Sequence, residues 1–219
     1  MQVKICGITN EADALFAAQC GAAAIGFIFY AASPRYIEPG ATQKIIRKLP
    51  QSLVSVGVFV NESQDIVKRI IESCGLDMIQ LRGDEPPEYC RNFPAYQVIK
   101  AVELKNETDL RLAESYNTAA ILVDSRYAGL YGGTGRRANW ELALRLKLKK
   151  PLILSGGLND ENITEAIEKV RPPALDINSG VEISPGKKDH AKIASLFKTI
   201  RKVDLASDNA KLIFTKRGI

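Results

Sequence analysis

Eight short apolar runs recur along the chain, roughly one every twenty to thirty residues, with helical patterns between them. The runs are rich in Val, Ile and Leu without strict alternation, which is typical of parallel strands covered by helices. They occupy residues 3–6, 23–29, 53–60, 77–81, 96–102, 119–124, 151–155 and 174–178. Eight strand–helix units predict a closed (βα)8 TIM barrel in a single domain. A doubly wound open sheet is the alternative, but it does not need eight similar units.

Polar residues predict where the helices begin. Asn10, Asn61 and Asn159 each precede apolar residues at helical spacing, and an asparagine side chain can cap the first N–H groups of a helix. We expect a catalytic barrel over residues 1–203 and a C-terminal extension over residues 204–219. That extension either packs on the barrel or is loosely ordered.

The composition is that of an ordinary globular protein. Of 219 residues, 46% are hydrophobic and 25% are charged, which is enough to bury a sizeable core. No apolar run reaches the ~18–20 residues that a membrane helix needs, and the first residues do not resemble a secretory signal. The four cysteines form no CxxC pair and are interpreted as reduced thiols. We therefore expect a cytoplasmic protein with no membrane partner.

The net charge of +5 raises the alternative of a nucleic-acid-binding domain. Such a domain needs a basic stripe with interleaved aromatic residues, whereas here basic and acidic residues are mixed and only 7% of residues are aromatic. We expect no nucleic-acid partner and a mild positive field that attracts a small anionic substrate. His190 is the single histidine, and we interpret it as structural. Acid–base chemistry is left to carboxylates, lysine or thiol.

Reactive side chains stand where predicted strands end, which is where barrels of this kind place their active sites. Cys6 is interpreted as a general base, with a small core residue as the alternative. Asp124 is interpreted as a general acid, with a helix cap or a loop hydrogen bond as the alternative. These two residues come from opposite sides of the barrel, so a substrate can lie between them. Arg35 either binds a carboxylate or phosphate or is a solvated loop residue.

A buried ion pair is predicted beside Cys6. Lys4 lies two residues before Cys6, so both side chains share one face of the first strand. In a closed barrel the last strand is next to the first, and it carries Asp176. Because a buried ammonium group should be paired, we predict a Lys4–Asp176 ion pair inside the barrel. Lys4 is then the cation that favours the Cys6 thiolate, or a residue that organises it.

Three glycine-containing loops follow the last three predicted strands. Glycine lets backbone approach a ligand closely, and free N–H groups at a loop or helix start attract anions. Three such clusters at one point of successive units favour a phosphate site over simple tight turns. The clusters contain Gly132, Gly133, Gly135, Gly156, Gly157, Ser179 and Gly180.

Ordered motifs covering nearly the whole barrel resemble the phosphoribosylanthranilate isomerase family of tryptophan biosynthesis. The motifs are KICGIT (4–9), GFIFYAASPRYI (26–37), VGVFVN (56–61), QLRGDE (80–85), LVDS (122–125), YGGTGRRANW (131–140), LSGGLNDENI (154–163) and DINSGVEISPGKKDH (176–190). The resemblance implies a (βα)8 barrel without cofactor or metal, acting on a small molecule as a monomer or homodimer. The implied reaction is the Amadori rearrangement of N-(5-phosphoribosyl)anthranilate to 1-(2-carboxyphenylamino)-1-deoxyribulose 5-phosphate.

The same resemblance implies roles for individual residues. Asp124 is the general acid that protonates the furanose ring oxygen, and Cys6 is the general base that removes the proton from C2′. Arg35 matches the position that holds the anthranilate carboxylate. The remaining implied substrate-binding residues are Gly133, Thr134, Gly135, Gly156, Gly157, Asp176, Asn178, Ser179 and Gly180.

Two positions depart from the family pattern. Arg82 stands where histidine is common, so it is either peripheral or an added positive charge. Asn178 stands where serine is common.

Related enzymes on the same fold are the main alternative functions. An indole-glycerol-phosphate synthase or a pentose-phosphate epimerase would share the barrel. The epimerase would need several metal-binding histidines, and the synthase would need a lysine acid at a strand end. The chain instead offers Cys6 and Asp124.

Overall fold

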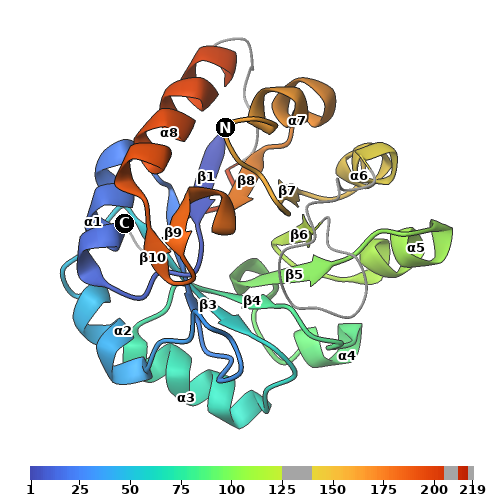
Figure 1. The fold of residues 1–219 in the computed structure, drawn as a ribbon. Coiled ribbons are helices and arrows are strands. Elements are labelled where there is room, and N and C mark those ends of the chain that lie inside the picture. The colour runs from blue at the N-terminus through green and yellow to red at the C-terminus, as the bar shows by residue number, and fades with distance from the viewer. Residues whose placement is uncertain (125–139, 205–211, 217–219) are drawn as a thin grey trace.

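The computed structural model describes residues 1–124, 140–204 and 212–216. Its centre is a closed barrel of parallel strands in which each strand pairs with the next along the chain and β8 pairs with β1 (Figure 1). The predicted (βα)8 barrel is therefore confirmed, and the open sheet is excluded. The barrel strands are β1 Gln2–Ile5, β2 Ala24–Ile28, β3 Val54–Phe59, β4 Met78–Leu81, β5 Val98–Val102, β6 Ala120–Val123, β7 Leu152–Leu154 and β8 Ala174–Ile177.

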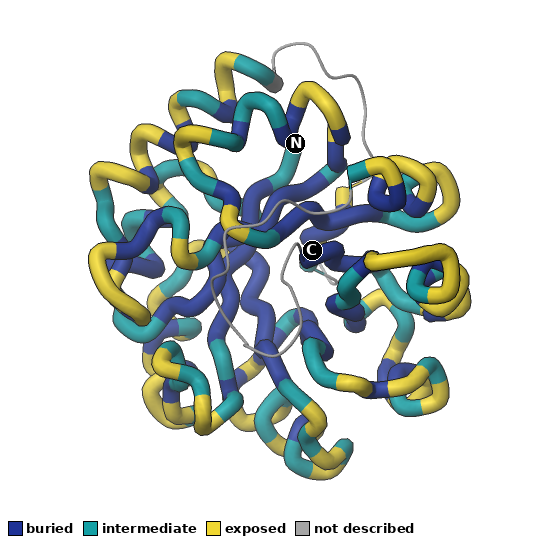
Figure 2. The backbone as a smooth tube through the Cα atoms, turned by 45° about the vertical axis from the view of Figure 1, so that its right-hand side comes forward, coloured by how far each residue is buried: buried dark blue, intermediate teal, exposed yellow. Residues whose placement is uncertain are grey.

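Helices surround the barrel, with their inner faces on the strands and their outer faces in solvent (Figures 1 and 2). The α-helices are α1 Glu11–Cys20, α2 Pro39–Ile46, α3 Gln64–Cys74, α4 Pro87–Cys90, α5 Glu107–Ser115, α6 Trp140–Lys147, α7 Ile163–Val170 and α8 His190–Asp204. Two short 3-10 helices, η1 Ala95–Gln97 and η2 Ser179–Val181, and a hairpin of β9 Glu182–Ser184 and β10 Lys187–Lys188 complete the described elements.

One of the three predicted helix starts is confirmed, and two lie further along the chain. The Asn10 side chain accepts the Asp13 N–H and caps α1. Asn61 does not cap α3, because it adopts the left-handed backbone conformation with φ 50°, and the cap is Ser63. The Asn159 side chain accepts an N–H within the turn before α7, so that helix begins later. Capping residues are easy to recognise, but in a polar loop several of them compete for one helix start.

His190 joins the first and last helices. Its ring stacks on Phe16, with 4.1 Å between the ring centroids, and its Nε2 lies 2.9 Å from Asp13 Oδ1. Phe16 and Asp13 belong to α1, whereas His190 begins α8. The structure therefore supports the interpretation of His190 as a structural residue.

The amino ends of the strands surround an apolar core that the C-terminal segment closes. Ile213 and Phe214 are buried there, against side chains from the interior of the barrel. The Gln2 side chain fixes them, because its Oε1 accepts both of their N–H groups, at 2.7 and 2.9 Å, and its Nε2 donates to the Phe214 carbonyl at 2.8 Å. The described part of the C-terminal extension thus packs on the barrel, one of the two outcomes expected for it.

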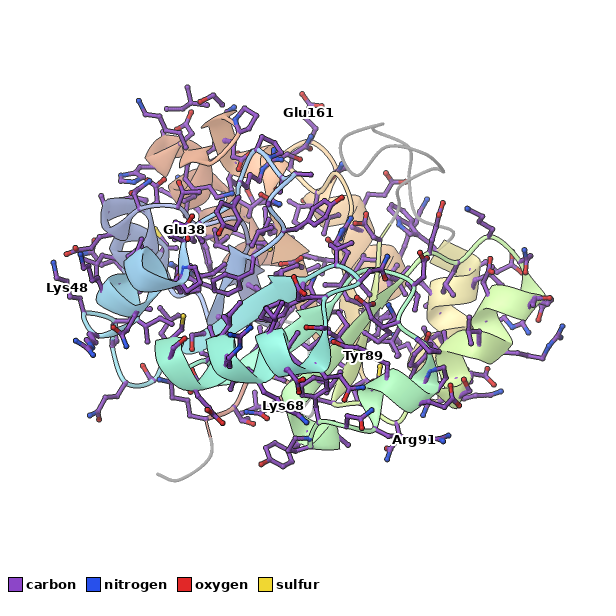
Figure 3. All side chains as sticks on the ribbon, turned by 90° about the horizontal axis from the view of Figure 1, so that it is seen from below. Glu38, Lys48, Lys68, Tyr89, Arg91 and Glu161 are labelled. Carbon is purple, nitrogen blue, oxygen red and sulfur yellow. The ribbon has the colours of Figure 1, made fainter. Side chains whose placement is uncertain are left out.

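Charged side chains cover the outer surface of the helices. Figure 3 shows Lys48 and Arg91 extending away from the barrel, and both are mostly exposed. Lys48 pairs with Glu11, and Arg91 lies near Glu88. Such exposed pairs add little stability, so Lys48 and Arg91 belong to a solvated surface. In the described ranges, no helix combines the length and apolar character needed to cross a membrane.

Candidate active site

A cavity of about 160 Å³ lies at the carboxyl ends of the strands, opposite the end closed by the C-terminal segment. Its walls come from distant parts of the sequence that barrel closure brings together, including the end of β1 and the loop after β2. The polar side chains that line it include Cys6, Arg35, Gln80, Arg82, Asp176 and Asn178. Four of the predicted site residues therefore share one cavity.

The predicted Lys4–Asp176 ion pair is confirmed. The Lys4 Nζ lies 2.7 Å from Asp176 Oδ1 and 2.9 Å from Gln80 Oε1, and Lys4 has no solvent exposure. Strand pairing explains the contact, because Lys4 and Asp176 are direct partners in the register of β1 and β8. Burial alone would lower the pKa of Lys4, but the charges of Asp176 and Cys6 outweigh burial and raise it. Lys4 therefore stays protonated at the base of the cavity.

Cys6 lies against Lys4, and a glycine makes room for both. An added Cβ at Gly26, on the neighbouring strand, would lie 2.7 Å from Cys6 Sγ and 3.0 Å from Lys4 Cε. Any larger residue at position 26 would displace the thiol or the ammonium group. The structure thus brings the thiol of the predicted base next to a buried cation.

Asp124 contacts an arginine that the sequence interpretation left out of the catalytic set. Arg82 Nη2 donates a hydrogen bond to Asp124 Oδ2, and Arg82 lines the cavity. Burial lowers the pKa of Arg82, but the negative groups Asp124, Cys6 and Asp176 together outweigh burial and raise it. Arg82 is therefore a central residue of the site and not a peripheral one. It directly follows β4, so the rule that selected residues at strand ends would have found it.

Arg35 is held by a glutamate that also binds a lysine, and sequence reasoning missed both of these partners. Its Nε lies 2.9 and 3.1 Å from the two carboxylate oxygens of Glu182, and its Nη2 lies 2.6 Å from Oε2. Lys188 Nζ binds the same carboxylate at 2.8 Å. Burial would raise the pKa of Glu182, but the hydrogen bond from Arg35 and the charge of Lys188 outweigh it, so the pKa is lowered. The sequence carries no local signal for this contact, because Arg35 and Glu182 are 147 residues apart.

Two of the three predicted glycine loops contact each other. Gly156 and Gly157 after β7 have φ values of 94° and 63°, which other residues rarely adopt. Gly180, in η2 after β8, lies so close to this loop that an added Cβ would be 2.0 Å from the Leu158 carbonyl oxygen. In TIM barrels the loops after strands seven and eight, with a short extra helix, frequently bind phosphate. Ser179 begins that short helix. The third predicted loop, with Gly132, Gly133, Thr134 and Gly135, lies outside the described residues.

Comparisons with known proteins agree with this arrangement. The family pattern of N-(5'-phosphoribosyl)anthranilate (PRA) isomerase matches residues 3–199. The N-(5'-phosphoribosyl)anthranilate isomerase of Syntrophus aciditrophicus is 52% identical over 201 residues, which cover 92% of this chain and 87% of that protein.

Solved structures give the same result. The crystal structure of phosphoribosyl anthranilate isomerase from Thermotoga maritima has a TM-score of 0.85 and 44% identity, covering 92% of this chain and 99% of that one. A second structure of a phosphoribosyl anthranilate isomerase, in complex with reduced 1-(o-carboxyphenylamino)-1-deoxyribulose 5-phosphate, has a TM-score of 0.82 and 42% identity, with the same coverage. The resemblance seen in the motifs is confirmed. The chain belongs to the N-(5'-phosphoribosyl)anthranilate isomerase family of tryptophan biosynthesis.

Proposed function

We propose that this isomerase carries out its rearrangement with Cys6 as general base and Asp124 as general acid. The observation that carries the proposal is the grouping of Cys6, Arg82 and Arg35 around one cavity, with Asp124 bonded to Arg82. The substrate is N-(5-phosphoribosyl)anthranilate, as the names of the relatives indicate. This grouping supplies a thiol, a carboxyl group and positive charge, which are the components that the reaction needs.

The chemistry then follows from proton transfers at two positions of the sugar. Asp124 protonates the furanose ring oxygen, the ring C–O bond breaks, and the anthranilate nitrogen supplies the electrons that form a Schiff base. Cys6 removes the proton from C2′, which leaves an enolamine that tautomerises to the ketone. A cysteine acts as a base in its thiolate form, and the Lys4 ammonium group beside it attracts that negative charge.

Two anion sites would orient the substrate. Arg35 takes the anthranilate carboxylate, since a guanidinium group binds a carboxylate through two parallel N–H groups. The phosphate lies on the loops that contain Gly156, Gly157, Ser179 and Gly180, with the 133–135 loop as a third contributor. Support comes from the contact between the loops after β7 and β8. Fixing both ends of the substrate leaves the sugar between the acid and the base.

Three further residues would complete the site. Asp176 contributes through Lys4, because the two form the ion pair beside Cys6. Asn178 lines the cavity next to Gly7, where an added Cβ would lie 2.7 Å from its Oδ1. Arg82 orients the Asp124 carboxyl group and stabilises the carboxylate that remains after Asp124 has given up its proton.

The test is an assay with freshly generated phosphoribosylanthranilate, following the loss of its fluorescence without added metal. Cys6→Ala should lower kcat by roughly 10²–10⁴-fold, with a smaller change in KM. Cys20→Ala is the matched control, because Cys20 ends α1 outside the cavity lining, and it should turn over normally. Normal turnover by Cys6→Ala would refute the assignment of the base. Inactivity of the unmodified protein would point to a related sugar-phosphate enzyme.

A further inference from the structure

The guanidinium group of Arg35 is engaged along one edge only. Glu182 occupies Nε and Nη2, and no described residue accepts a hydrogen bond from Nη1. The Arg35 side chain is 14% exposed and lines the cavity, whereas Glu182 is buried. A guanidinium group has two edges that each fit a carboxylate. The protein carboxylate thus takes one edge, and the other can face a ligand carboxylate.

A second cation shares the same carboxylate. The Lys188 side chain is completely buried, and its Nζ lies 2.8 Å from Glu182 Oε1, 3.0 Å from Asn178 Oδ1 and 3.2 Å from the Asn178 carbonyl oxygen. If Glu182 paired with Arg35 alone, the two charges would cancel. Burial lowers the pKa of Lys188, and the adjacent Glu182 carboxylate opposes that effect. When Lys188 is protonated, two cations face one anion, so the group of three carries a net positive charge next to the cavity.

The group also packs against the backbone directly after Cys6, at Gly7. Gly7 follows Cys6 and has φ 72°, and an added Cβ there would lie 2.9 Å from Arg35 Cδ and 2.7 Å from Asn178 Oδ1. The Arg35 side chain therefore packs directly on the backbone next to the proposed base. A small movement of Arg35 would shift a bound substrate relative to Cys6.

We propose that Glu182 and Lys188 are positioning residues that hold Arg35 and maintain the positive charge with which it binds the carboxylate of the substrate. This inference rests on the proposed role of Arg35. Arg35 comes from the loop after β2, and a long side chain on a loop loses conformational entropy when it binds a ligand. Glu182 removes that cost in advance, because it already fixes the guanidinium group. Lys188 prevents Glu182 from neutralising the charge that the substrate needs.

The competing interpretation is purely structural, in which Glu182 and Lys188 only attach the β9–β10 hairpin to the barrel. A structural role would lower stability and would alter KM independently of Arg35. A positioning role acts through Arg35, so its effect on KM must disappear when Arg35 is absent. A double-mutant cycle separates these two cases.

The experiment measures kcat and KM for phosphoribosylanthranilate in Glu182→Gln, Lys188→Met, Arg35→Ala and the two double variants that combine each with Arg35→Ala. Glu182→Gln and Lys188→Met should each raise KM about tenfold, with a smaller change in kcat. In the Arg35→Ala background, each should add less than about twofold. Lys187→Met is the matched control, because Lys187 is the exposed neighbour of Lys188 on the same strand, and its KM should be unchanged.

The outcomes distinguish the two proposals. An unchanged KM in Arg35→Ala would refute the role of Arg35 and with it the proposed carboxylate site. A raised KM in Arg35→Ala, together with an equal effect of Glu182→Gln in both backgrounds, would overturn the positioning role alone. Circular dichroism establishes that each variant is folded. If Glu182→Gln does not fold, Glu182→Asp replaces it, because aspartate keeps the charge but is too short to hold Arg35 in the same place. It should raise KM only when Arg35 is present.

Discussion

The amino ends of the barrel strands enclose apolar side chains and are closed by Ile213 and Phe214, whereas the carboxyl ends enclose charges. Lys4, Asp176 and Glu182 are all buried at the carboxyl ends or next to them. Burying apolar groups stabilises the folded state directly. Burying charges costs solvation free energy, which good ion-pair geometry only partly returns. The apolar contacts at the amino ends therefore stabilise the folded state. That stability offsets the cost of burying the charged groups at the carboxyl ends.

The strongest test of this comparison is Asp124→Asn at the carboxyl end. Asparagine keeps the shape of the side chain and can still accept a hydrogen bond from Arg82, but it cannot donate a proton as an acid. We expect kcat to fall roughly 10²–10⁴-fold, with little loss of stability. Steady-state kinetics and denaturant unfolding measure the two effects. A stable variant with normal kcat would exclude Asp124 as the acid.

Lys4→Met tests whether the buried pair serves stability or chemistry. The change leaves Asp176 as an unpaired buried charge, so unfolding should become easier by about 3–5 kcal/mol. Combining it with Asp176→Asn removes the unpaired charge and should restore much of the free energy of unfolding. Turnover should stay low in both variants, because the cation beside Cys6 is missing. A double variant with normal turnover would show that the pair has no role in the reaction.

Phe214→Ala tests the opposite end of the barrel. Removing this buried ring should lower the free energy of unfolding by about 3 kcal/mol while kcat stays within about twofold. Leu212→Ala is the control, since Leu212 is 63% exposed in the same segment and should change stability by less than about 0.5 kcal/mol. If Phe214→Ala lowered kcat without lowering stability, the division between the two ends would be wrong.

The smallest expected effect is a dependence on pH. Because the folded-state pKa of Glu182 is lowered from 4.5, its contribution to stability is present above that value and is lost as the pH falls through the lowered pKa. Glu182→Gln lacks this contribution, so below pH ~4 its stability should decline less steeply than that of the unchanged protein. Acid titrations followed by circular dichroism compare the two slopes. Identical slopes would show that Glu182 is not stabilised as an anion.

Local patterns predicted the barrel and the Lys4–Asp176 pair, because side-chain alternation and barrel closure determine which strand faces which. They did not predict the contacts that Glu182 makes with Arg35 and Lys188. Those contacts join the loop after β2 to a hairpin after β8, and their geometry depends on how two irregular segments pack. Arg82 was undervalued for a different reason. It departs from the family pattern, so its position directly after β4 was given too little weight, and its contact with Asp124 shows that it belongs to the site.

The hydrogen bonds between Gln2 and Phe214 bring the beginning of the chain and its last described segment together on the face opposite the cavity. A protein fused genetically ahead of Met1 would therefore lie away from the substrate entrance. That end of the barrel can accept a covalently joined module while the cavity at the other end stays open.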